Sequence, residues 1–330
     1  MNLRRERPSL RYLEIGELSH LLLQRRSNTA PFTHKNWRES YYFNATDEKK
    51  QLSLITTIGI LPNRRRSSGF VIIIHKGKIA LAKLLITRDI KWHETDSFCI
   101  RGLTYNVEGI DWHLGYRSKK YNFNMLFRPI NEFYQYNKED DQQNQGNSRM
   151  LFSQHIEQAG IFKGEIELNG NRIGFGPSPG HRDHSWGVRS WSSIDSYWLF
   201  SCTLGKDRAF NLWKGSSQGK PFQSGYYFDS KRNLKILSSE IRGQDTGKMG
   251  EPGGSEINFW DEEGEKHEVK CQVICSVPIP LPGSIVYETI AKIRLDNRWG
   301  FGLLERHVHD TNPFHKIRAL YSLQKRRGRH

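Results

Sequence analysis

The chain has 330 residues, of which 36% are hydrophobic and 12% aromatic, and this length predicts either one large domain or two of ordinary size. The aromatic content argues against a mostly disordered chain, and the low mean hydropathy argues against an integral membrane protein. Its 50 lysines and arginines against 35 acidic residues give a formal net charge of +15, which would attract a polyanion such as nucleic acid or an anionic membrane surface. Many basic residues lie in runs near the two ends, a pattern typical of solvated termini.

The pattern along the first half of the chain is typical of short β-strands. Residues 1–30 form a basic lead-in that we expect to be partly helical, and strands are expected from Trp37 onward. Lys76-Gly77 lies between two apolar runs and predicts a tight hairpin turn. The expected strands have the spacing of a sandwich or barrel and cover residues 52–61, 70–75, 78–85, 97–106, 111–116 and 121–128.

A polar stretch over residues 137–150 interrupts this series and predicts a linker. Beyond it, Asn169-Gly170 predicts another hairpin turn, and no long helical period lies between the later apolar runs. The sequence therefore predicts an all-β chain rather than a parallel βαβ sheet. We expect two β-rich domains, over residues 31–150 and 151–330. The later strands are expected in that hairpin, over residues 162–175, and at 196–204, 209–214, 224–228, 233–237, 268–277, 284–295 and 300–308.

The four cysteines, Cys99, Cys202, Cys271 and Cys275, lack the paired spacing of a zinc site, and we expect reduced, buried thiols in a cytoplasmic protein. Cys271 and Cys275 would share a face on a regular strand. The first residues lack the apolar core of a signal peptide. The sequence carries no nucleotide-binding, zinc-protease or nucleic-acid-binding signature, so we expect no cofactor and no specific nucleic-acid partner. Peripheral association with an anionic membrane stays open.

The densest unusual stretch runs from Gly176 to Trp191 and reads GPSPGHRDHSWGVRSW. Its first glycines and prolines predict a turn, followed by an extended segment on which His184 and Trp186 share one face and Asp183 lies on the other. An imidazole beside an indole on an inward face suits a pocket for an apolar substrate, because the imidazole exchanges protons near neutral pH. The alternative interpretation is a polar network that ties a strand end to a loop and performs no chemistry.

We expect no metal ion in this stretch. His181 and His184 are three residues apart, so they face opposite sides of a strand, and carboxylate partners are not obvious. Glu39 and Glu305 are candidate buried acids, because a carboxyl group in an apolar pocket has a raised pKa. The alternative is that each of them pairs with an arginine at the surface.

The segment GHRDHSWGVR, residues 180–189, resembles the signature of a lipocalin-like superfamily. That superfamily includes carotenoid 1,2-hydratases of the hydroxyneurosporene synthase type, kievitone-hydratase-like proteins, lipocalin-like Diels–Alderases and AttH-like proteins. Upstream, WRESYYFN (37–44) and GILPN (59–63) are similar to the opening of the first domain in its uncharacterised branch. GFGLLE (300–305) is a third match, so the resemblance spans residues 37–308 in the right order.

The resemblance implies two lipocalin-like antiparallel β-barrel or half-barrel domains packed side by side, with an apolar cavity and no organic cofactor. In the hydratase branch, an Asp-His-x-Trp motif and a downstream carboxylate line the cavity and protonate an alkene, to which water is added. Asp183, His184 and Trp186 match that motif. The strand expected to hold the downstream acid reads AFNLW, with Asn211 in its place, and an amide cannot supply the proton. Cyclisation, isomerisation and simple ligand binding therefore stay open beside hydration.

Two classes of function follow. The first is a cofactor-free hydratase, cyclase or isomerase (a lyase or isomerase in reaction class) acting on an apolar isoprenoid-like or polyketide-like substrate in a β-barrel cavity. The second is a non-catalytic carrier of a hydrophobic ligand. In the enzyme, His184 transfers the proton while Asp183 or Glu39 orients it or acts as the acid, so His184→Ala should fold and be inactive. The residues expected to contact the substrate are Trp186, Trp191, Tyr41, Tyr42, Trp198 and Asn211.

Overall fold

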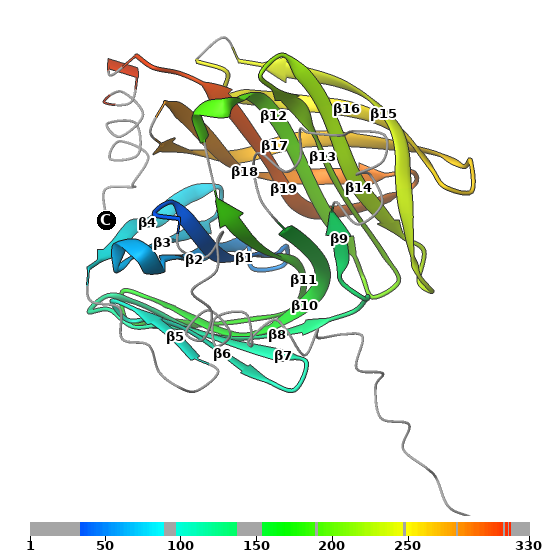
Figure 1. The fold of residues 1–330 in the computed structure, drawn as a ribbon. Helices are drawn as coiled ribbons and strands as arrows, with labels where there is room; N and C mark the ends of the chain where they lie inside the picture. The colour runs from blue at the N-terminus through cyan, green and yellow to red at the C-terminus, as the bar shows by residue number, and fades with distance from the viewer. Residues whose placement is uncertain are drawn as a thin grey trace, which may run out of the picture.

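The computed structural model describes residues 34–88, 97–136, 154–188, 191–246, 249–281, 283–312, 314–315 and 317. The lead-in expected over residues 1–30 and the linker expected over 137–150 lie outside these residues. Within them the chain is almost entirely β-structure, arranged as two curved sheets side by side (Figure 1). The expected all-β fold with two barrel-like units is therefore confirmed.

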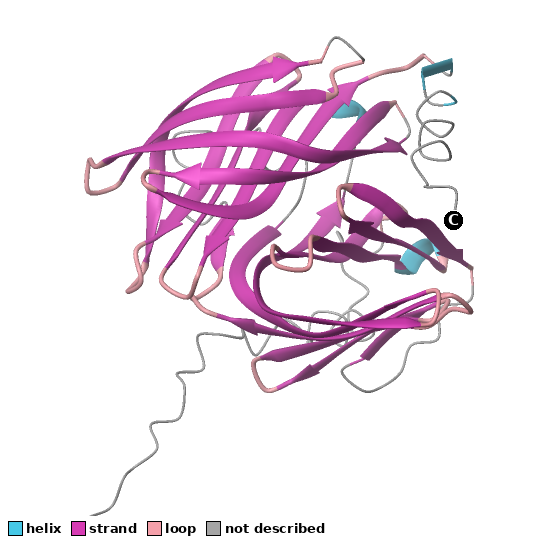
Figure 2. Ribbon diagram, turned by 180° about the vertical axis from the view of Figure 1, so that it is seen from behind, coloured by secondary structure: helices cyan, strands magenta, loops and turns pink. Residues whose placement is uncertain are grey.

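The first sheet has 11 strands, all paired in antiparallel fashion, in the order β4-β3-β2-β1-β11-β10-β8-β7-β6-β5, with β9 paired to β10. The end strands β4 and β5 approach each other, so the sheet curls almost closed around its own core (Figure 2). Its strands are β1 (Trp37–Asp47), β2 (Leu52–Leu61), β3 (Arg66–His75), β4 (Lys78–Thr87), β5 (Ser97–Ile100), β6 (Leu103–Glu108), β7 (Asp111–Tyr116), β8 (Tyr121–Pro129), β9 (Tyr134–Tyr136), β10 (Gln154–Leu168) and β11 (Asn171–Val188).

The second sheet is a closed barrel in which each strand pairs with its neighbour in the sequence and β12 pairs with β19. Closure leaves the barrel without a free edge. Its strands are β12 (Ile194–Leu204), β13 (Arg208–Ser217), β14 (Lys220–Phe228), β15 (Asn233–Asp245), β16 (Pro252–Asp261), β17 (Lys266–Leu281), β18 (Ser284–Leu295) and β19 (Arg298–His309). Two short 3-10 helices, Pro62–Arg64 and Trp191–Ser193, lie between strands.

Both hairpin turns predicted from the sequence are present. Lys76-Gly77 joins β3 to β4 and Asn169-Gly170 joins β10 to β11, with positive φ at all four residues, as a tight two-residue turn requires. The turn expected over residues 176–180 is absent, because β11 continues through this segment. The register between β10 and β11 shifts by a β-bulge between Phe162 and Gly164, opposite this segment. Such a bulge bends a strand without ending it, so β11 continues.

The change from one sheet to the other differs from the boundary expected at residue 150. β10 and β11 come after that position, yet they pair with β8 and β1 in the first sheet. The sheet changes between Val188 and Ile194. Residues 137–150 fall between β9 and β10, which pair with each other, so the polar composition marks a long connection within one sheet. The motif over residues 180–189 consequently begins in the first sheet and not in the second unit, where we expected it.

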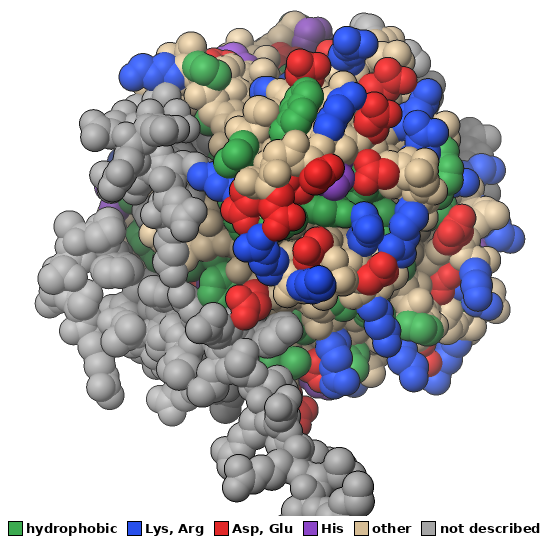
Figure 3. All heavy atoms as spheres, turned by 90° about the vertical axis from the view of Figure 1, so that its right-hand side faces the viewer, with side chains coloured by type: hydrophobic (Ala, Val, Ile, Leu, Met, Phe, Trp, Pro, Cys, Tyr) green, Lys and Arg blue, Asp and Glu red, His purple; other side chains and the backbone are tan. Residues whose placement is uncertain are grey.

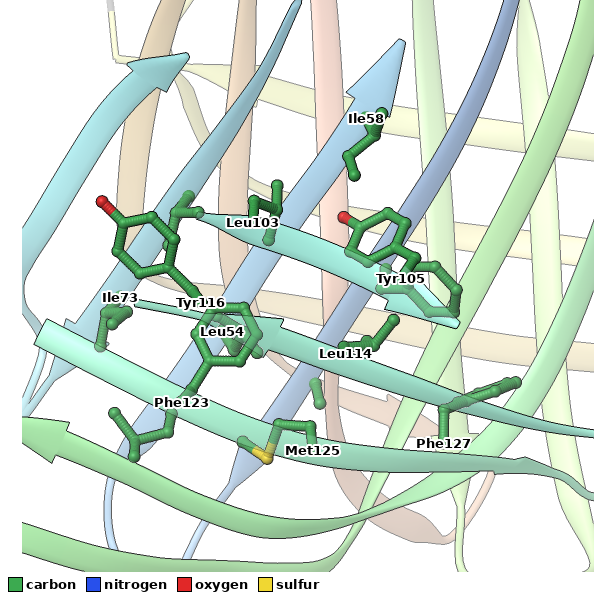
Figure 4. Packing of buried hydrophobic residues seen from close by; sticks show 14 of the residues in the cluster. Leu54, Ile58, Ile73, Leu103, Tyr105, Leu114, Tyr116, Phe123, Met125 and Phe127 are labelled. Atoms are coloured by element: carbon green, nitrogen blue, oxygen red, sulfur yellow. The ribbon is translucent and has the colours of Figure 1, made fainter. Parts of the chain in front are cut away.

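Each sheet encloses its own core. Aromatic and aliphatic side chains fill the interior of the first sheet, and Figure 4 shows Tyr105 and Phe127 among them. A separate cluster around Phe210 fills the second barrel. A third cluster joins the outer faces of the two units, with Ile72 from the first sheet and Trp213 from the second barrel. Burial of this apolar surface holds the two units together.

The cysteines follow the expectation only in part. Cys202, Cys271 and Cys275 are buried thiols, but Cys99 is exposed. Cys271 packs into the core of the second barrel, whereas Cys275 packs into the cluster between the two units. The shared face expected for these two residues is wrong, because a register shift between Val273 and Cys275 changes the alternation of the strand.

The outer surface of the second barrel mixes charges of both signs. Lys266 Nζ lies 2.9 Å from Glu268 Oε1, and Lys270 Nζ lies 3.3 Å from Glu256 Oε1. The face shown in Figure 3 accordingly has basic and acidic side chains interspersed and no large basic patch. The basic runs at the two ends of the chain lie outside the described residues. Among the residues that are described, no helix has the length and apolar character needed to cross a membrane.

Candidate functional site

The paired strands β1 and β11 present two faces with different surroundings. Tyr41 lies opposite His184 across the pair, and Tyr42 lies opposite Asp183. Because side chains alternate along a strand, Tyr41 and His184 point into the first sheet, while Tyr42 and Asp183 point toward the second barrel. The motif therefore contributes to both faces.

The inner face holds a buried, hydrogen-bonded cluster. His184 Nε2 lies 2.8 Å from Glu39 Oε1, and the Tyr41 hydroxyl donates to the same oxygen at 2.7 Å. The imidazole stacks on the ring of Tyr41, with the two centroids 4.2 Å apart. It also contacts Trp186, whose ring centroid lies 4.5 Å from that of the imidazole. Glu39, Tyr41 and His184 are 0% exposed. The structure thus pairs His184 with Glu39 rather than with Asp183. The cavity between the sheets is not lined by Glu39, Tyr41, His184 or Trp186.

A cavity of about 500 Å³ lies between the outer faces of the two units. β1 to β4, β10 and β11 line it on one side, and β12, β13 and β17 to β19 line it on the other. Apolar side chains such as Phe70, Leu199 and Leu281 form much of the wall, and a small number of ionisable groups converge on it. We expected such a cavity within a barrel, but the barrel interiors are occupied by their cores.

Two carboxyl groups from the second barrel form the most distinctive part of this cavity. Glu288 on β18 lies directly opposite Glu305 on β19. The Tyr42 hydroxyl donates to Glu288 Oε2 at 2.8 Å, and the Tyr197 hydroxyl donates to Glu305 Oε1. Burial, and next the negative charge of Glu305, raise the pKa of Glu288 well above its ordinary value. The surroundings of Glu288 therefore favour its protonated form.

Arg38 and Asp183 line the same cavity. Burial lowers the pKa of Arg38 to about 10, and the negative charge of Asp183 acts in the opposite direction, so the guanidinium stays charged at neutral pH. Gly59 on β2 makes room for it, since a Cβ at that position would lie 2.2 Å from Arg38 Nη2. The hydroxyls of Ser40 and Ser185, 3.2 Å apart, complete this polar wall.

The remaining substrate-contact candidates divide between the cavity and other surroundings. Tyr42 and Trp191 line the cavity. Trp198 instead stacks on Phe200 and on the guanidinium of Arg306, which lies 4.6 Å from its ring centroid. Asn211 is fully buried and accepts a hydrogen bond from Tyr136, and it does not line the cavity. Asn211 is therefore no replacement for an acid in this site.

Sequence reasoning missed four ionisable cavity residues: Arg38, Lys83, His155 and Glu288. One pattern could have indicated Glu288. It is the only charged residue in the run SIVYETIA, residues 284–291, whose other members are apolar or small. A single acid in the middle of an apolar strand must face either solvent or a polar cluster, and here both faces of the strand are buried.

The architecture matches solved structures at low sequence identity. A candidate AttH protein of Nitrosomonas europaea is 12% identical, with a TM-score of 0.62 over 83% of this chain and 93% of that one. The protein CghA is 9% identical, with a TM-score of 0.63 over 84% and 90%. Kievitone hydratase of Nectria haematococca is 9% identical, with a TM-score of 0.58 over 83% and 89%. These likenesses show that the chain shares its fold with these proteins, as we expected from the motifs.

No curated protein matches the sequence. A family model described as a domain of unknown function, DUF7064, matches residues 24–310, and the chain belongs to this family. The match extends across the strands of both sheets, so the family model covers both units together.

Proposed function

We propose that this member of the DUF7064 family is an enzyme that transfers protons to and from an apolar substrate in the cavity between its two sheets. Hydration, cyclisation and isomerisation are the outcomes that such chemistry allows. The carboxyl pair of buried Glu288 and partly exposed Glu305 carries the proposal, because two acids held opposite each other beside an apolar wall favour a shared proton. The cavity volume of about 500 Å³ suits an isoprenoid-like or polyketide-like molecule.

The proposed reaction begins with transfer of the proton shared by Glu288 and Glu305 to an alkene carbon. The π electrons form the new C–H bond and leave a carbocation, while the carboxyl pair becomes more negative. Tyr42, Trp191 and Trp213 present aromatic rings around the cavity, and each such face stabilises a desolvated cation by ~0.5–2 kcal/mol. Attack by water followed by loss of a proton gives hydration. Attack by a second alkene closes a ring and leaves a new carbocation, which then loses a proton. Direct loss of a neighbouring proton from the first cation gives an isomer. In each case, the released proton restores the pair.

The test is turnover in deuterated buffer with a panel of isoprenoid and polyketide alkenes, followed by solvent extraction and mass spectrometry. We expect one substrate to gain either the mass of water or deuterium on carbon. Glu288→Gln and Glu305→Gln should each abolish this change, since an amide cannot deliver the proton. Glu256→Gln, on the outer surface of the second barrel, is the matched control and should retain it. Unchanged turnover in both cavity variants would contradict the mechanism.

A carrier of a hydrophobic ligand is the second candidate. It is favoured by the position of His184, which packs in the core of the first sheet and therefore leaves the motif without a catalytic imidazole in the cavity. The same extraction separates the two functions. A ligand recovered without added water, deuterium or rearrangement supports the carrier.

A further inference from the structure

A second group of ionisable side chains lies on β10 and β11, on the first sheet's side of the cavity. β10 contributes His155 and Glu157, and β11 contributes His181 and Asp183 with the same spacing. Residues two apart on a strand share a face, and Glu157 lies directly opposite Asp183, so all four side chains point toward the second barrel. The partner of His181 is thus Asp183, two residues on, rather than His184, which we considered from the sequence.

The four groups are close enough to act on one small ion. His155 Nε2 lies 2.8 Å from Glu157 Oε1, and His181 Nε2 lies 2.8 Å from Glu157 Oε2. One nitrogen or oxygen of each of His155, Glu157 and Asp183 lies within 4.8 Å of the others. His155, Glu157 and His181 are 3%, 2% and 3% exposed, so water cannot solvate these groups freely.

The placement of the two acids argues for a cation between them. Carboxylates directly opposite each other on neighbouring strands repel, and burial strengthens that repulsion. Arg38 on β1 acts on Asp183, while Glu157 contacts the two imidazoles. A divalent ion between Glu157 and Asp183 would convert the repulsion into two attractive contacts.

We propose that His155, Glu157 and Asp183 bind a divalent transition-metal ion, with His181 holding the second oxygen of Glu157. Donors bound to one ion at ~2.1 Å lie ~3 Å from each other, so the present spacing needs only small movements of side chains. A ligating carboxylate whose other oxygen contacts a histidine is the usual outer arrangement of such sites. One imidazole with two carboxylates favours Zn²⁺, Mn²⁺ or Fe²⁺ over Cu⁺, which prefers sulfur.

The position of the site gives the ion access to a ligand. His155 and Asp183 line the cavity, so open coordination positions face the space where the apolar molecule would lie. A water molecule or an oxygen of the ligand can occupy such a position. The ion site does not depend on the proposed reaction, because the carboxyl pair of Glu288 and Glu305 lies on the opposite wall.

Metal content of the full chain tests the proposal. The protein is purified without a polyhistidine tag, stripped with chelator, dialysed separately against Zn²⁺ and Mn²⁺, and passed through gel filtration. We expect about one ion per chain for at least one of the two metals by mass spectrometry. Asp183→Asn should weaken binding, measured by calorimetric titration, by more than the ~10–100-fold typical of outer partners, and His181→Ala by ~10-fold.

His113→Ala is the matched control, because His113 and Glu108 form a histidine–acid pair at the surface, 3.5 Å apart. It should bind the metal as tightly as the wild type. Substoichiometric metal in the wild type, or equal affinity in Asp183→Asn, would overturn the proposal.

Cobalt gives a readout that needs no variant to fold. Co²⁺ added to the stripped wild type should produce visible absorption bands stronger than those of aqueous Co²⁺, and Zn²⁺ should displace them. A spectrum identical to that of the free ion would also overturn the site. Because none of these measurements involves turnover, the metal site and the proposed reaction fail separately.

Discussion

The two faces of β1 and β11 differ by one residue step and have opposite character. On the inner face, Glu39 is enclosed with His184, and Glu39 Oε1 makes hydrogen bonds with His184 and Tyr41. On the outer face, Asp183 shares an open cavity with carboxyl groups from another part of the chain. The comparison shows that burial alone does not identify a reactive group, since the more deeply buried pair is the one without access to a substrate.

The largest difference in stability between the two faces should follow from removing the imidazole of the inner face. His184→Ala leaves the Glu39 carboxylate buried without its histidine and opens a void beside Tyr41. Loss of one member of a buried ionisable pair costs ~3–5 kcal/mol, so the variant should lose this much free energy of unfolding in urea. This revises the expectation from the sequence that the variant would fold normally.

Ser185→Ala, one residue along the same strand, is the matched change on the cavity face. It removes a hydroxyl 3.2 Å from that of Ser40 and should cost only about 1 kcal/mol. Equal losses in the two variants would mean that the two faces do not differ in their structural role.

The carboxyl groups of the outer face should make the free energy of unfolding depend on pH. Burial of Glu288, followed by the negative charges of Glu305 and Asp183, raises its pKa above the ordinary value of 4.5 in the folded state, and the hydrogen bond from Tyr42 acts in the opposite direction. Between these two pKa values the folded state binds more protons than the unfolded chain. The free energy of unfolding therefore falls as pH rises through this range, by up to ~1.4 kcal/mol per pH unit for one group.

Glu288→Gln should flatten this dependence, because the amide is neutral at every pH. Urea unfolding at intervals from acidic to mildly alkaline pH measures the slope for the wild type and the variant. Glu256→Gln, on the outer surface, should keep the wild-type slope. A slope that persists unchanged in Glu288→Gln would show that other groups cause it.

The smallest expected effect comes from the glycine that accommodates Arg38. The methyl group of Gly59→Ala would lie 2.2 Å from Arg38 Nη2, but the guanidinium is the flexible end of its side chain and can move. We expect a loss of about 1 kcal/mol in thermal or urea unfolding, at the low end for overpacking. Gly174→Ala, whose added methyl group would meet nothing within 4 Å, should be neutral. A loss of several kcal/mol in Gly59→Ala would indicate that Arg38 cannot move.

The fold class and the alternation of the motif could be predicted from local patterns. Strand period and the Gly-containing turns are encoded by neighbouring residues, so the two hairpins were found where expected. The same alternation separated Asp183 from His184. The alternation could not reveal which face of β1 and β11 meets the second barrel, because both faces of these two strands are buried.

The acids of the cavity could not be assembled from the sequence. Tyr42 and Glu288 are 246 residues apart, and their hydrogen bond depends on the docking of two sheets. Glu288 and Glu305 become neighbours through the register of β18 and β19, which is fixed by the closed barrel. The resemblance placed Asn211 where the superfamily's acid is expected, and in the fold Asn211 accepts a hydrogen bond from Tyr136 and does not line the cavity.

The division of the cavity walls between two separately packed units has a consequence for how activity could diversify. Each unit keeps its own core, so side chains at their junction, such as Ile72 and Trp213, can vary in size without disturbing either interior. Such changes would alter the width of the gap and the angle at which the acids meet a bound molecule. Relatives with this architecture can therefore diverge in the molecules they accept while the two scaffolds remain the same.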